Sequence, residues 1–246
     1  MSNTIPIFFD FGGTLVDTLE VTRLVFKQAL GKDFPNSKIK QMYKDTSSKG
    51  QSMSMFFKYP VNPVKLLVKR NKLISLQREI FMETVELYDD IKETLYKIKK
   101  LDKNISLILV TQNPLLENEE DSKILMERLF GEDNPFDQIL AGEDKFDLIV
   151  LNFDSDIIAR GIFVGDLPND VYVAELLKIP CFGVTWGYSD SEELKTPFIV
   201  EEIPTLIEMV KDHLEDLKED TKETVEEIEF EEIDFEDNDD FELIGN

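Results

Sequence analysis

IPIFFDFGGTLVDT (residues 5–18) is the stretch that decides the fold. Its apolar run, Ile5 to Phe9, is too short for a helix and ends in Asp10 followed by a Gly-Gly pair two residues later. A short apolar run that meets a turn signal is typical of a buried strand that feeds a loop. We therefore expect a strand over residues 5–9, with Asp10 at its carboxyl end.

Further apolar runs alternate with helical patterns along the rest of the chain. Strands are predicted over residues 105–110, 138–141, 161–164, 181–185 and 198–200. Helices are predicted over residues 19–30, 65–84, 90–100, 122–130, 146–153, 170–178 and from 204 to about 217. This alternation predicts an α/β fold with a doubly wound parallel sheet, and residues 17–85 form a helical insert after the first strand.

Polar side chains follow the predicted strands where a parallel sheet places its ligands. Two or three carboxylates, one hydroxyl and one lysine converge at this edge: Asp10, Thr111, Lys145, Asp166 and Asp170. Opposed carboxylates need a cation between them, and hard oxygen ligands select magnesium. A lysine, a hydroxyl and free backbone amides around that cation suit a phosphoryl group. The residues thus indicate a site for Mg²⁺ and a small phosphorylated substrate.

The motifs carrying these residues resemble those of the haloacid dehalogenase superfamily. DFGGTLVDT (residues 10–18) is similar to its first motif, ILVTQN (108–113) to its second, and Lys145 to its third, although Phe146 replaces the proline that usually follows. IFVGDLPNDVYVAELLKIPCFGVTWGY (162–188) resembles the fourth motif of phosphoglycolate-phosphatase-like members. LYDDIKETLYKIKK (87–100) looks like their return from a helical cap. The resemblance covers residues 5 to about 210 and implies a Rossmann-like core with a cap domain.

The resemblance also implies roles for individual residues. Asp10 would attack phosphorus and form an aspartyl-phosphate. Asp10, Asp166 and the Gly12 carbonyl would hold Mg²⁺, and Asp170 would orient Lys145 or a metal-bound water. Thr111 and Lys145 would bind the phosphoryl oxygens and stabilise their charge, with Gly13 and Gln112 completing the substrate site. Trp186 and Tyr188 are expected to flank the site or pack beside it rather than catalyse.

One position departs from the family pattern. Active phosphatases of this group usually carry a second aspartate two residues after the nucleophile as general acid and base, and here that residue is Gly12. Such a group contributes about 10²–10⁴-fold in rate. The leading interpretation is a Mg²⁺-dependent phosphatase. The alternatives are a binding or regulatory protein with little or no turnover and, ranked lower, a 2-haloacid dehalogenase or a phosphonate hydrolase.

Charge divides the chain into three regions. The whole chain has 27 basic and 51 acidic residues, a net charge of −24, whereas residues 21–78 carry 13 basic and two acidic side chains. Residues 212–246 hold 17 acids and two lysines. We expect a core at 1–16 and 86–211, a basic cap at 17–85, and a disordered acidic tail at 212–246. The tail is interpreted as solvated, with contact to the cap or to a basic protein partner as the alternative.

The remaining composition excludes several functions. One cysteine (Cys181) and one histidine (His213) rule out a disulfide framework, Ser-His-Asp chemistry and most histidine-built metal sites. The net charge disfavours nucleic acid, which only the basic cap could contact. We find no signal peptide or membrane span and expect a cytoplasmic protein. Cap residues select the substrate, but sequence does not show which of its candidates face the site: Phe56, Phe57, Lys58, Arg70 and Arg78.

Overall fold

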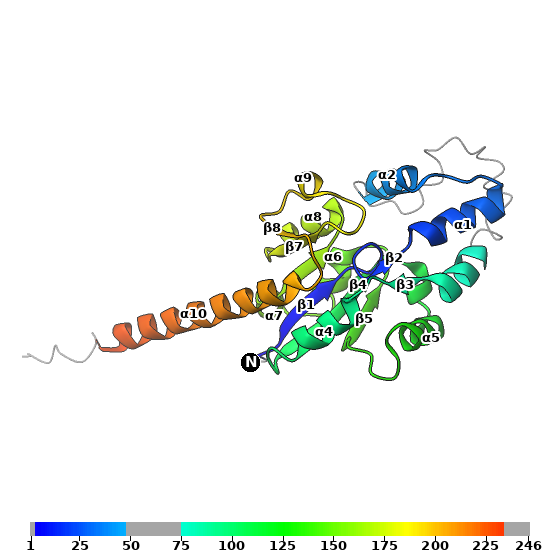
Figure 1. Cartoon of the computed structure of the whole chain (residues 1–246). Helices are drawn as coiled ribbons and strands as arrows, with labels where there is room; N and C mark the ends of the chain where they lie inside the picture. The colour runs from blue at the N-terminus through cyan, green and yellow to red at the C-terminus, as the bar shows by residue number, and fades with distance from the viewer. Residues whose placement is uncertain (1–2, 48–74, 234–246) are drawn as a thin grey trace, which may run out of the picture. The chain divides into compact units, whose positions relative to one another are not determined.

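The computed structural model describes residues 3–47 and 75–233. The chain forms two compact units, residues 1–207 and 208–246. The first unit is built on a parallel six-stranded sheet in the order β5-β4-β1-β6-β7-β8 (Figure 1). Its strands are β1 (Ile5–Phe9), β4 (Ile105–Thr111), β5 (Gln138–Ala141), β6 (Ile162–Gly165), β7 (Cys181–Val184) and β8 (Phe198–Val200). The predicted doubly wound α/β fold is confirmed.

Strand β1 lies in the middle of this sheet. It pairs with β4 on one side, where Phe9 lies opposite Leu109, and with β6 on the other, where Phe9 lies opposite Val164. Its last residues are fully buried because both faces of the sheet are covered. That is why the strand reads as a continuous apolar run rather than an alternating one.

The strand order places the helices in two layers. The chain steps outward from β1 through β4 to β5 and then returns to β6, β7 and β8. Crossovers between parallel strands are right-handed. The helices that connect the strands on the outward path therefore lie on one face of the sheet, and those on the return path lie on the other. Helices α4 (Ile91–Lys99) and α5 (Glu119–Phe130) cover one face. Helices α6 (Lys145–Val150), α7 (Ser155–Ile158) and α8 (Pro168–Leu177) cover the other (Figure 1).

Each face has its own core. Phe8 belongs to a buried cluster with Ile149 of α6 and Ala174 of α8. The next residue, Phe9, points the opposite way, and its ring meets Phe136 edge-on at 6.0 Å between centroids. Alternation along β1 therefore anchors both layers to one strand and fixes where that strand ends.

The insert after β1 begins and ends at a two-stranded antiparallel sheet. Strand β2 (Val16–Asp17) pairs with β3 (Glu86–Leu87), so the chain leaves and re-enters the core at neighbouring points. Between them lie α1 (Leu19–Leu30), α2 (Asn36–Ser47) and a helical segment at residues 75–84. The rest of the helix expected over 65–84 lies outside the described residues. A separate cap at 17–85 stays a prediction.

In the sequence, Asp17 followed by Glu20 has the spacing of a capping box at a helix start, but the structure does not form one. The residue before the helix is Thr18, whose side chain makes no capping hydrogen bond. The Asp17 carboxylate instead accepts the Leu19 N–H at 2.9 Å, while Glu20 pairs with Arg23. The helix itself begins at Leu19, as predicted, and Asp17 ends β2 directly before the turn into this helix.

Residues 212–233, part of the tail that we expected to be disordered, lie in a helix. Helix α10 runs over Thr205–Ile233 and therefore continues well past residue 212. Charge density suggested disorder, but residues 212–233 contain no Gly or Pro and are rich in Glu, which has high helix propensity. Residues 234–246 lie outside the described part. No helix within the described ranges is long and apolar enough to cross a membrane.

Candidate active site

Lys145 lies between two carboxylates at the carboxyl edge of the sheet. Its ammonium group donates hydrogen bonds to Asp10 and, at 2.6 Å, to Asp170. Asp10 follows β1, Lys145 begins α6, and Asp170 lies in the first turn of α8. All three are buried, with exposed fractions of 5%, 4% and 0%. Three segments that are distant in sequence thus form one charged cluster.

Local turns hold these side chains in place. Asp144 caps α6 by accepting the Asp147 N–H at 3.1 Å, which sets Lys145 at the first helical position. Asp170 uses its second oxygen to accept the Leu167 N–H at 3.0 Å. The cap of α6 therefore fixes the backbone of Lys145, and a main-chain N–H holds the Asp170 carboxylate in place.

Asp166 completes a set of three buried carboxylates. Asp10, Asp166 and Asp170 each place one oxygen within 4.8 Å of the others. The two oxygens of Asp166 accept hydrogen bonds from the Thr14 hydroxyl at 3.1 Å and the Tyr188 N–H at 2.8 Å. Carboxylate oxygens in this arrangement fit a hard divalent cation such as Mg²⁺.

The electrostatics of the cluster favour a bound cation. Burial raises the pKa of Asp10 to about 6, against the attraction of Lys145. Burial and the charges of Asp10 and Asp170 also raise the pKa of Asp166 well above its ordinary value. Burial alone would lower the pKa of Lys145, but the two carboxylates that it contacts outweigh this and raise it. The single lysine leaves the carboxylates with surplus negative charge.

The turn after β1 is shaped around Asp166. Gly13 has a φ of +94°, and a Cβ on it would lie 2.3 Å from an Asp166 carboxylate oxygen. Only glycine fits there, because both the backbone region and the close approach exclude a side chain. Gly12 differs: its φ is not positive, and a Cβ would meet Thr18 at 3.4 Å, an ordinary contact. The backbone therefore does not require glycine at position 12.

The two residues expected from the second motif lie at the end of β4. Thr111 is buried, and its hydroxyl accepts the Asn113 N–H at 3.1 Å. The Gln112 side chain donates to the backbone carbonyl of Glu143. Because β4 runs parallel to β1, Thr111 ends at the same sheet edge as Asp10. Their contact with a phosphoryl group stays a prediction.

The structure adds side chains that sequence did not identify as part of the site. From α2, Lys40 donates to the Gly187 carbonyl at 2.7 Å. The Tyr43 ring stacks on Tyr188 with centroids 4.6 Å apart and planes 12° from parallel. Thr14 binds Asp166, as described above. Of these residues, only Thr14 could have been found from the sequence, because it directly follows the Gly-Gly pair.

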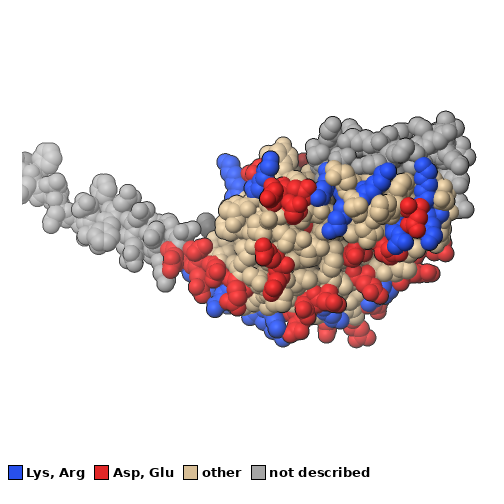
Figure 2. Space-filling model, turned by 45° about the horizontal axis from the view of Figure 1, so that its top comes forward, with Lys and Arg blue, Asp and Glu red and all other residues tan. Residues whose placement is uncertain are grey.

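The basic insert contributes positive charge on one side of the first unit. On the face shown in Figure 2, Lys and Arg side chains gather at the upper right beside the undescribed residues, and Asp and Glu predominate below. Among the candidates for substrate selection, Arg78 pairs with Asp121 of α5. The other four, Phe56, Phe57, Lys58 and Arg70, lie outside the described residues.

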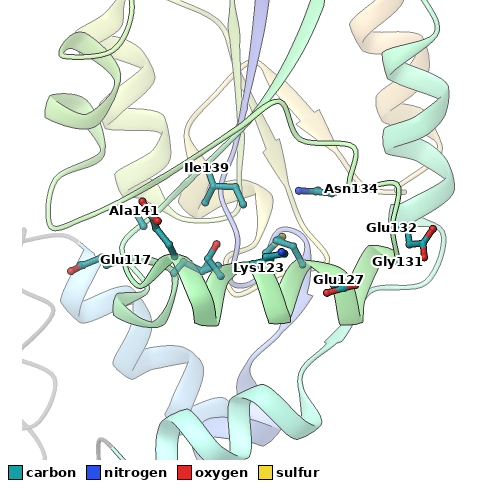
Figure 3. Close-up of a pocket in the computed structure, with 12 residues that line it drawn as sticks. Glu117, Lys123, Glu127, Gly131, Glu132, Asn134, Ile139 and Ala141 are labelled. Atoms are coloured by element: carbon teal, nitrogen blue, oxygen red, sulfur yellow. The ribbon is translucent and has the colours of Figure 1, made fainter.

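A separate hollow of about 700 Å³ lies between α5 and the sheet edge at β5 (Figure 3). Its lining includes Ile139 of β5 and Lys123 of α5, but no residue of the carboxylate cluster. Four glutamates also line it: Glu117, Glu119, Glu127 and Glu132. This acidic lining does not suit a phosphorylated ligand.

Comparison with known proteins finds a matching family and solved structures of similar fold. The model of the haloacid dehalogenase-like hydrolases matches residues 7–184. A "predicted phosphatase" from Clostridium acetobutylicum is 24% identical, with a TM-score of 0.63 over 85% of this chain and 99% of its own. A "predicted phosphoglycolate phosphatase" from Haemophilus somnus is 19% identical, with a TM-score of 0.62 and the same shares covered. CbbY from Rhodobacter sphaeroides, solved with phosphate, is 20% identical, with a TM-score of 0.61 over 82% and 96%. A search of the curated proteins finds no match.

Proposed function

Because the chain belongs to the haloacid dehalogenase-like hydrolases, we propose that it hydrolyses phosphate monoesters through an aspartyl-phosphate on Asp10. The observation that carries this proposal is the buried contact of Lys145 with both Asp10 and Asp170 beside the third carboxylate, Asp166. An aspartate, a lysine and a cation-binding carboxylate set at one sheet edge are what phosphoryl transfer needs.

In the first step, an Asp10 carboxylate oxygen attacks phosphorus. A bond forms between this oxygen and phosphorus while the bond from phosphorus to the leaving-group oxygen breaks. In the second step, a water oxygen forms a bond to phosphorus while the bond from phosphorus to the Asp10 oxygen breaks. The protons of the water leave with the inorganic phosphate, the departed alkoxide takes a proton from solvent, and Asp10 is restored as a carboxylate. In the metal-free protein burial raises the pKa of Asp10 to about 6, and a cation bound beside it would favour the reactive ionised form.

Lys145 has two roles in this scheme. Its hydrogen bond orients the Asp10 carboxylate, and its charge stabilises the phosphoryl oxygens in the transition state. Asp170 also accepts a hydrogen bond from this ammonium group, at 2.6 Å, so Lys145 is shared between the two carboxylates.

Mg²⁺ would be held by Asp10, Asp166 and Asp170, with the Gly12 backbone carbonyl as a further ligand. When bound, it supplies positive charge that offsets the repulsion between carboxylates and phosphate. Thr111, Gln112, Gly13 and Lys145 would bind the phosphoryl oxygens. The basic insert would attract the anionic substrate.

The alternative is a binding or regulatory protein with little turnover. Gly12 favours it, because no side chain at this position can supply the general acid and base. The buried cluster favours an enzyme, because three desolvated carboxylates are costly to maintain without a function. The two readings differ in whether Asp10-dependent phosphate release occurs.

The test is phosphate release from a panel of phosphate monoesters, with Mg²⁺ and with EDTA. The wild-type protein should release phosphate with Mg²⁺ but not with EDTA, and Asp10→Asn should abolish this release. Asp102→Asn, on a surface turn before β4, is the matched control and should leave the rate unchanged. Beryllium fluoride capture by the wild type but not by Asp10→Asn would show a competent site even where substrates are poor. Phosphate release that survives Asp10→Asn would overturn the proposed nucleophile.

A further inference from the structure

One face of α5 lines the hollow beside β5. Five residues of this helix lie at positions i, i+3, i+4, i+7 and i+8, and all of them border the hollow: Glu119, Ser122, Lys123, Met126 and Glu127. Residues with this spacing share one side of an α-helix. Because a helix rises by about 1.5 Å per residue, Glu119 and Glu127 lie about 12 Å apart along its axis. The hollow therefore extends along the helix for about two turns.

The negative charges of this hollow are spread along its length. Glu117 lies at one end and Glu132 at the other, with Lys123 and Glu127 between them (Figure 3). No three glutamates of the lining bring carboxylate oxygens within 4.8 Å of one another, because among the described residues only the carboxylate cluster at the sheet edge does so. A compact divalent cation needs several oxygens around one point. The spread of charge instead suits a ligand whose positive charges are spaced along a chain.

The bottom of the hollow is apolar, whereas its negative charges are exposed. Leu116 and Met126 are buried, and Ile139 and Ala141 of β5 are half-buried. The four glutamates that line the hollow are all exposed. Burial of methylene groups against an apolar surface is favourable, and an ammonium group carried by such a chain can stay near water. The lining therefore fits an organic cation with a hydrocarbon chain.

A buried hydroxyl without a partner also lines the hollow. Ser122 is only 7% exposed. Its backbone N–H donates to the Asn118 carbonyl, but its hydroxyl makes no hydrogen bond with any residue that the structure describes. Buried polar groups are normally hydrogen-bonded, because an unpaired one is costly. This hydroxyl therefore indicates a polar group of a ligand in the hollow, and its oxygen can accept a hydrogen bond from an ammonium group.

From these observations we propose that the hollow binds a linear organic polycation of the polyamine class. The ammonium groups of the ligand pair with the exposed glutamates, and its methylene groups pack on Leu116, Met126 and Ile139. One ammonium N–H donates to the Ser122 hydroxyl. Four glutamates and one lysine, Lys123, leave the lining with a net charge of −3. Because the hollow shares no residue with the carboxylate cluster, this inference does not depend on the proposed function.

The test is isothermal titration of the full chain with spermine. The buffer contains Mg²⁺, which fills the proposed metal site and competes for scattered surface carboxylates. The wild type should show one saturable site. Glu119→Gln combined with Glu127→Gln should raise its Kd about 10-fold, because two exposed ion pairs are lost. Ser122→Ala should raise the Kd about 5-fold through loss of one hydrogen bond, whereas Lys123→Gln should lower it about 3-fold, because it removes a like charge.

Controls separate this site from attraction to the acidic chain as a whole. Glu208→Gln combined with Glu215→Gln removes the same charge from exposed positions of α10 and should leave the Kd at its wild-type value. The thermal unfolding temperatures of all variants should also stay at the wild-type value. Equal losses of affinity in the two double variants would overturn the inference, because they would show attraction to net charge alone. A wild type without saturable spermine binding would overturn it as well.

Discussion

Replacing Gly13 by alanine tests how the turn after β1 supports Asp166. The added Cβ would lie 2.3 Å from one Asp166 carboxylate oxygen and 2.7 Å from its carboxyl carbon. Gly13 also has a φ of +94°, where an L-residue is strained. The substitution therefore carries two separate costs, one in the backbone and one from moving a fully buried carboxylate.

Both costs can be given a magnitude. Left-handed strain for a non-glycine residue is about 1–2 kcal/mol. Moving Asp166 weakens its hydrogen bonds from Thr14 and Tyr188, and one bond to a charged group is worth about 1.5–3 kcal/mol. We therefore expect Gly13→Ala to lower the free energy of unfolding by about 4 kcal/mol, close to the upper end for a single substitution.

The assay is equilibrium unfolding in urea in the presence of EDTA, with Gly31→Ala as control. Gly31 ends α1 at a φ of +67°, but a Cβ there would meet no atom within 4 Å. The free energy of unfolding of Gly31→Ala should therefore fall only by the backbone strain, about 1–2 kcal/mol. Isothermal titration with Mg²⁺ should show weaker binding for Gly13→Ala and unchanged binding for Gly31→Ala. Equal losses of stability with equal Mg²⁺ affinity would refute the close packing of Gly13 against Asp166.

Three further predictions concern the described core. Because burial raises the folded pKa of Asp10 from 3.8 to about 6, the metal-free protein should lose stability as pH rises through this range. The share of this loss that Asp10 causes should reach about 3 kcal/mol above its folded pKa. Urea unfolding in EDTA at several pH values should show a loss smaller by this amount in Asp10→Asn, in which the buried Asp166, whose pKa is also raised, still titrates. Phe8→Ala should lower the free energy of unfolding by about 3–5 kcal/mol, because Phe8 is fully buried. Phe198→Ala should lower it clearly less, because Phe198 is 41% exposed, and similar losses for the two variants would argue against the assigned core. Cys181 should react slowly with a thiol reagent, because it is buried and its pKa is raised by that burial, and a fast reaction without urea would contradict its place in β7.

Much of the first unit could be read from periodicity. The run from Ile5 to Phe9 and the run that begins at Ile105 are apolar throughout because the sheet is covered on both faces, and both are central strands. The residues that follow the strands could also be predicted to lie together, since parallel strands bring their carboxyl ends to one edge of the sheet. This logic predicted the meeting of Asp10, Lys145, Asp166 and Asp170, although Lys145 lacks its usual proline.

Local signals failed where pairing or helix propensity prevailed over charge. The spacing of Asp17 and Glu20 suggested a capping box, but Asp17 pairs with Glu86 in the small sheet and its carboxylate accepts the Leu19 N–H instead. The acidic run after residue 212 suggested disorder, but the chain is helical to Ile233. A core, a basic cap and an acidic tail as separate domains, and contact of the tail with the cap or a basic partner, stay predictions.

The sequence by itself determined the α/β architecture and the candidate nucleophile, lysine and carboxylates, because hydrophobic period and strand-end position are local properties of the chain. Tertiary structure alone decided that Gly13 packs against Asp166 and that Gly12 faces the hydroxyls of Thr18 and Tyr188. Those residues are separated by up to 176 positions, and no spacing rule links them. Contacts of this kind arise when crossovers bring loops to one sheet edge, and at that edge side-chain packing fixes which groups surround the site.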